Sequence, residues 1–76
     1  MNNVRRKALN EIAAQVEELM SALESLKDEE EEYRDNIPEN LQGSERYDKA
    51  DAACINLDSA YSGLEDVLSY IEEATA

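Results

Sequence analysis

The centre of the chain carries the segment Asn36-Ile37-Pro38-Glu39-Asn40-Leu41-Gln42-Gly43-Ser44, which holds the only proline and one of the two glycines. A residue that precedes proline is disfavoured in the helical conformation, so a helix that reaches this segment should end near Ile37. Ser44 is a good helix N-cap, and Glu45 follows it where a new helix has its positive end. We therefore expect a turn between two helices. Within this turn, we expect a 3₁₀ or irregular stretch at 38–41, apolar cover from Ile37 and Leu41, and a relaxed backbone at Gly43.

Both flanks of this turn repeat apolar residues at alternating intervals of three and four, which is the heptad pattern of paired helices. The first row is Leu9, Ile12, Val16, Leu19, Leu23, Leu26, Glu30 and Tyr33. The second row is Tyr47, Ala50, Cys54, Leu57, Tyr61, Leu64, Leu68 and Ile71. The pattern predicts an all-α fold: one domain over 1–76, with helices at about 4–35 and 44–74, a loop at 36–43, and Asn2 or Asn3 as the first N-cap. The two helices should form an antiparallel coiled-coil hairpin.

The two rows match layer by layer if Leu26 packs at the level of Cys54. On one flank, this register pairs Lys27 with Asp51 and Arg6 with Glu72. The other flank is mostly small and apolar, and we expect a second copy to dock there and complete a four-helix bundle. The residues of this expected dimer face are Ala8, Gln15, Ala22, Ala53, Ala60, Val67 and Ala74. The alternative is that the alanines only favour helix formation.

The net charge of −12 over 76 residues is large. It argues against nucleic acid or an anionic membrane as a direct ligand, since phosphate binding depends on clustered Lys and Arg. It fits a basic protein partner, imitation of nucleic acid, or simply a solvated helix surface. The acidic surface that we single out is Asp28, Glu29, Glu31 and Glu32, while Glu30 falls in the helix seam and could reach Arg46 or Lys49.

The sequence offers little for catalysis or for a cofactor. Histidine is absent, and the single cysteine, Cys54, occupies a seam position where a thiol should be buried and inert. The acidic run lacks the alternating ligands and central glycine of a calcium loop. We therefore expect no enzyme activity, no metal and no cofactor. The lone cysteine and the absence of a long apolar run predict a cytoplasmic protein that does not enter membranes.

Candidate residues for binding a partner lie in the turn and at two apolar positions on the outer face of the second helix. They are Pro38, Glu39, Asn40, Leu41, Gln42, Ser44, Arg46, Ile55 and Tyr70. Exposed tyrosine is a common anchor at protein interfaces. Alternatively, the turn residues only build a strict helix connection, and single exposed apolar residues are ordinary.

The turn 35–47, together with Arg5–Leu9 and the acidic heptads, resembles a group of small, uncharacterised acidic helical-hairpin proteins. These occur in Firmicutes, particularly gut bacteria, and in their prophages and mobile elements. The resemblance implies a cytoplasmic, phage- or mobile-element-encoded protein. Such genomes encode small acidic inhibitors of host or defence proteins, including anti-CRISPR proteins and DNA mimics. The hypotheses are therefore an inhibitory interaction module, a DNA mimic, or a structural module whose only partner is itself.

Overall fold

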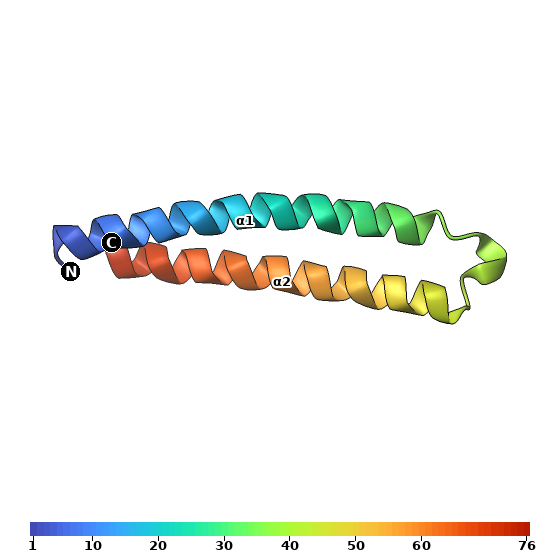
Figure 1. Cartoon of the computed structure of the whole chain (residues 1–76). Coiled ribbons are helices and arrows are strands. Elements are labelled where there is room, and N and C mark those ends of the chain that lie inside the picture. The colour runs from blue at the N-terminus through green and yellow to red at the C-terminus, as the bar shows by residue number, and fades with distance from the viewer.

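A computed structural model describes all 76 residues and contains only helices. Helix α1 spans Asn3–Asp35, the 3₁₀ helix η1 spans Glu39–Leu41, and α2 spans Glu45–Thr75. The two long helices lie side by side and antiparallel, with both termini at one end and η1 at the other (Figure 1). The Cα atoms extend over 59 × 15 × 13 Å, so the molecule is a rod. The prediction of a two-helix hairpin is confirmed.

Both helices begin with the side-chain caps that the sequence indicates. The Asn2 side chain accepts a hydrogen bond from the Arg5 N–H at 2.8 Å. The Ser44 hydroxyl accepts one from the Tyr47 N–H at 3.4 Å and donates to the carbonyl of Leu41. Each cap satisfies a backbone donor that has no partner within its own helix. The helix bounds consequently lie within one residue of those expected.

The connection between the helices begins where Pro38 disfavours the helical conformation of the residue before it. The Ile37 N–H turns back to the Arg34 carbonyl at 3.2 Å, and Pro38 is extended, with φ −56° and ψ 144°. Ile37 is only 3% exposed and closes the end of the helix pair, as expected. Leu41 was expected to share this role, but it is 40% exposed. Gly43 has no positive φ, and a Cβ atom there would meet nothing within 4 Å, so the expected need for glycine was wrong.

Helix α2 turns its predicted row inward, and every member of that row is buried or half-buried. Helix α1 is rotated relative to the prediction. Four members of its row form a stripe that we call the exposed stripe: Ile12, Leu19, Leu26 and Tyr33, with exposed fractions of 46%, 61%, 57% and 44%. The inward positions are instead taken by the residues that follow each of them, namely Ala13, Met20, Lys27 and Arg34.

Polar contacts across the seam explain why this rotation is favourable. The Lys27 ammonium donates to Asp58 at 3.2 Å and lies 5.7 Å from the centre of the Tyr61 ring. The Arg34 guanidinium donates to Asp51 at 3.1 Å. Turning the exposed stripe inward would carry both cations away from these partners. Their long side chains also cover apolar surface along the seam with their methylene groups.

The ion pairs also correct the predicted register on this flank. Lys27 pairs with Asp58 instead of Asp51, one heptad further along α2, and Arg34 takes Asp51. Arg6 makes no ion pair with Glu72, and its Nε donates instead to the Thr75 carbonyl at 3.0 Å. Long flexible side chains reach along the helix axis, so heptad letters alone do not determine which acid each cation selects.

The interior that results is thin. Five residues are buried, and none of their side chains is fully enclosed; they are Val16, Met20, Ile37, Ala50 and Cys54. A single seam between two helices has no third surface to cover it. The stability of the hairpin therefore depends on a few side chains near its middle.

Met20→Ala should lower the free energy of unfolding by about 2–5 kcal/mol, because it empties one of the few buried positions of α1. Chemical denaturation followed by circular dichroism measures this change. Glu18→Ala, two residues away and exposed, is the control and should leave the stability nearly unchanged. Equal effects of the two substitutions would contradict the rotation of α1.

Candidate interaction surfaces

The expected dimer face is accessible along most of its length. Ala8, Gln15 and Ala22 of α1 are exposed, as are Ala60, Val67 and Ala74 of α2, while Ala53 is half-buried. The exposed stripe lies three or four residues from the α1 members and therefore on the same side of that helix. The face is thus wider and more apolar than the sequence pattern suggested.

A signal for this wider face was present in the sequence. Besides its expected row, α1 has Ala13 and Met20 directly after Ile12 and Leu19, so apolar residues occupy three heptad positions. Such a stripe is broader than the two-position seam of a simple coiled coil. One neighbouring helix can cover only part of this stripe. The prediction considered only two heptad positions and therefore missed the part that stays exposed.

The turn residues that we proposed for partner binding divide into two groups. Those at the tip are exposed and make no side-chain hydrogen bond; they are Pro38, Glu39, Asn40, Leu41 and Gln42. Ser44 and Arg46 have structural roles instead. Ser44 caps α2, and the Arg46 Nε donates to the Tyr33 hydroxyl at 2.8 Å while its guanidinium lies 5.3 Å from the ring centre. This contact ties the start of α2 to the end of α1.

Ile55 and Tyr70 are exposed by 59% and 73%, as expected for the outer face of α2. They are separated by fifteen residues, or roughly 22 Å along a helix. The structure therefore does not gather the proposed partner-binding residues into one patch. They lie at the tip and at two separate points on α2.

The acidic run lies on the outer side of α1 near the turn. Asp28, Glu29 and Glu32 are exposed, Glu30 and Glu31 are half-buried, and none of the five makes an ion pair. Glu30 was expected to reach Arg46 or Lys49, but Arg46 contacts Tyr33 and Lys49 pairs with Glu45 at 3.2 Å. That expectation was wrong because nearer partners hold both cations.

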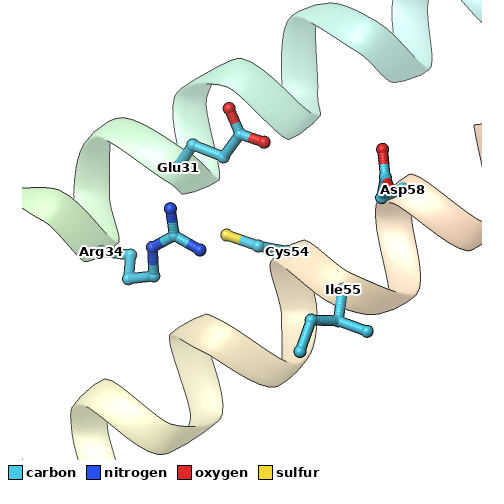
Figure 2. Close-up of a pocket in the computed structure, with 5 residues that line it drawn as sticks. All are labelled: Glu31, Arg34, Cys54, Ile55 and Asp58. Carbon is cyan, nitrogen blue, oxygen red and sulfur yellow. The ribbon is translucent and has the colours of Figure 1, made fainter.

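One shallow, open pocket of about 220 Å³ lies between the helices beside Cys54. Figure 2 shows Glu31 and Arg34 entering from α1, with Arg34 extending toward Cys54, while Ile55 points away from α1. The remaining lining residue is Asp58. Pockets that enclose small ligands are usually about 300–1,000 Å³ and well covered, so this opening is small by comparison.

The charged side chains beside the pocket stabilise the contact between the helices and do not make Cys54 a reactive nucleophile. Burial raises the pKa of the Cys54 thiol, and the nearby Arg34 charge offsets only part of this effect. The thiol therefore stays neutral near pH 7 and is a poor nucleophile. Hydrogen bonds to Asp35 and then Asp51 raise the pKa of Arg34, and the hydrogen bond to Asp58 raises that of Lys27. Both cations remain charged and available to their carboxylate partners.

Three further observations bear on function. No group of three or more cysteine, aspartate or glutamate side chains is placed to hold a metal ion. Neither helix combines the length and apolar character that crossing a membrane requires. No protein-family model, curated protein or solved structure matches this chain.

The raised pKa of Cys54 predicts a pH dependence of stability. Above the ordinary thiol pKa of about 8.5, the unfolded chain releases this proton while the folded chain keeps it, so the free energy of unfolding should fall as pH rises. Thermal melts between about pH 7 and pH 10 measure this effect. Cys54→Ala removes the group, and its melting temperature should fall less over the same range. Parallel curves for the two proteins would show that the thiol is not held neutral.

Proposed function

We propose that the chain is a non-enzymatic interaction module that binds a basic protein through its acidic surface. The observation that supports this best is the number of carboxylates without a cation. Nineteen acidic residues face seven basic ones, and five of these cations are held by contacts within the chain. These five are Arg6, Lys27, Arg34, Arg46 and Lys49. A rod with so strong a field attracts cationic partners and orients them before contact.

The exposed part of the run 28–32 is the centre of this proposed surface. Its carboxylates make no ion pair within the chain. A partner with clustered Lys or Arg would gain attraction there without first breaking an ion pair of this protein. We place this action in the cytoplasm, where a free thiol such as Cys54 persists.

The module would act as a homodimer that forms a four-helix bundle. Support comes from the thin interior and from the apolar face along α1 and α2. A phage- or mobile-element-encoded inhibitor of a host or defence protein, of the anti-CRISPR kind, is the most concrete form of the proposal. Its support is the resemblance of the turn and the acidic heptads to small hairpin proteins of prophages. The third hypothesis, a structural module that binds only itself, requires the dimer but no further partner.

The rod shape also favours a DNA-mimic form of the same proposal. Duplex DNA carries one phosphate per 1.7 Å of its axis, or roughly 35 over the 59 Å length of this rod. One chain has 19 acidic residues, about half that number, and two chains side by side would approach it. Charge imitation therefore requires the dimer. It would act on the nucleic-acid site of a basic protein.

Neutralising the acidic run should abolish capture of such a partner. The variant Asp28→Asn, Glu29→Gln, Glu31→Gln, Glu32→Gln should retain on the order of tenfold less of the captured protein than wild type in a pull-down from bacterial lysate. The matched control, Glu65→Gln, Asp66→Asn, Glu72→Gln, Glu73→Gln, removes the same number of charges at the other end of the rod and should capture normally.

Salt and DNA distinguish the forms of the proposal. A partner that is released by moderate salt and displaced by duplex DNA indicates charge imitation. A partner that stays bound under both conditions indicates a specific interface. If wild type captures nothing beyond itself, or if both variants capture equally, the acidic run is not a binding surface.

A further inference from the structure

We propose that a second copy of this chain covers the exposed stripe, and that its α1 runs antiparallel to the first. The proposal rests on the homodimer suggested above and adds its face, orientation and register. The contact would join α1 to α1 along Ile12, Leu19 and Leu26. The exposed row Ala8, Gln15 and Ala22 would receive these side chains.

The uncovered surface area suits a dimer. The chain exposes 5570 Å², whereas a compact protein of 8.6 kDa exposes about 4,700 Å². The excess of roughly 900 Å² is close to the 800 Å² or so that each partner buries in a standard protein interface. One further copy on this face would therefore bring the exposed surface near the value for a compact protein.

The spacing along α1 is self-complementary in the antiparallel orientation. Ile12, Leu19 and Leu26 of the exposed stripe recur every seven positions, and each is preceded four positions earlier by a member of the row Ala8, Gln15 and Ala22. With a two-fold axis near Glu17, each of these three side chains meets a member of that row on the partner. Leu26 meets the partner's Ala8, Leu19 meets the partner's Gln15, and Ile12 meets the partner's Ala22. Alanine at two of these three points allows close approach of the two helices.

Charge along α1 selects the antiparallel orientation. Arg5 lies on the same seven-residue spacing as the exposed stripe, and in this register it meets the partner's Glu29. The side chains of Arg5 and Lys7 make no ion pair or hydrogen bond within the chain, and neither do those of Asp28 and Glu29. An antiparallel pair brings Arg5 together with Glu29 of the other copy at both ends. A parallel pair would set the two acidic runs against each other.

The ion pairs within the hairpin show which side of the rod the partner approaches. Lys27–Asp58 and Arg34–Asp51 bridge α1 and α2 on one flank of the seam. By helical spacing, the exposed stripe lies on the other flank, next to the small residues Ala60 and Val67 of α2. Each copy therefore presents α1 and the edge of α2 to its partner, which makes a four-helix bundle and leaves Ile55 outside it.

A charge in the exposed stripe tests the face. Leu19→Glu should convert a dimer of wild-type chains to monomers with unchanged helicity, because Leu19 is 61% exposed in its own hairpin. Light scattering after size exclusion and circular dichroism measure mass and helicity. Ile55→Glu places the same charge on the other side of the rod and should remain dimeric. A monomeric wild type overturns the proposal, as does a dimer that survives Leu19→Glu or is dissociated by Ile55→Glu.

The orientation has its own test, which does not depend on changing an apolar residue. Arg5→Glu should weaken the dimer about threefold to tenfold at low salt, because it places a second negative charge opposite Glu29 at each end of the contact. Adding Glu29→Arg to the same chain should restore the wild-type affinity. Failure of this double substitution to restore binding overturns the antiparallel register.

Cross-linking then tests the register directly. In a Cys54→Ala background, an Ala8→Cys protein mixed with a Leu26→Cys protein should form a covalent dimer on mild oxidation. Neither variant alone should do so efficiently, since residues 8 and 26 are roughly 27 Å from their own counterparts. Equal cross-linking of the single variants overturns the register. These results are independent of whether the acidic run binds another protein.

Discussion

Every feature of this fold depends on the contact between α1 and α2, because each helix has only the other to pack against. A single seam buries few side chains, and here only five residues are buried. The rotation of α1 about its own axis therefore decides which residues stabilise the hairpin and which remain exposed to a partner. The observed rotation buries Met20 and places Lys27 and Arg34 at the seam, and it leaves Leu19 and Leu26 in solvent.

This arrangement gives the two faces of the rod different properties. On one flank, Lys27 and Arg34 pair with Asp58 and Asp51 and bridge the two helices. On the other flank lies an apolar stripe, and near the turn lies a run of carboxylates without cations. Apolar contact and charge attraction would then have separate roles. The stripe and the Arg5–Glu29 contacts would hold two copies together, and the rest of the acidic run would remain free for a basic partner.

The proposed dimer would supply the density of negative charge that the proposed imitation of DNA requires. One chain carries 19 carboxylates along its 59 Å length, about half the number of phosphates in duplex DNA of that length, and its net charge is only −12, so imitation of nucleic acid requires two associated rods. Bringing two such acidic rods together costs repulsion. Antiparallel pairing reduces this cost because Arg5 approaches Glu29 in the acidic run of the other copy. The same basic end would have no such partner in a single hairpin.

Much of the fold was predictable because its determinants are local. Pro38 and Ser44 end one helix and begin the next by restricting or capping the backbone of their immediate neighbours. Alternating three- and four-residue spacing identified both helices and the inward row of α2. The rotation of α1 and the ion-pair register were not predictable in this way. Apolar residues occupy three heptad positions of α1, so its pattern is compatible with more than one inward face.

The sequence by itself determined the two helices, the turn between them and the strong negative charge, since these follow from neighbouring residues and composition. Only the tertiary structure decided which α1 residues face α2 and which acids Lys27 and Arg34 select. These choices depend on the relative free energies of alternative packings between segments far apart in the chain. Local spacing leaves such packings nearly equivalent, and long cationic side chains reaching across the seam favour one of them.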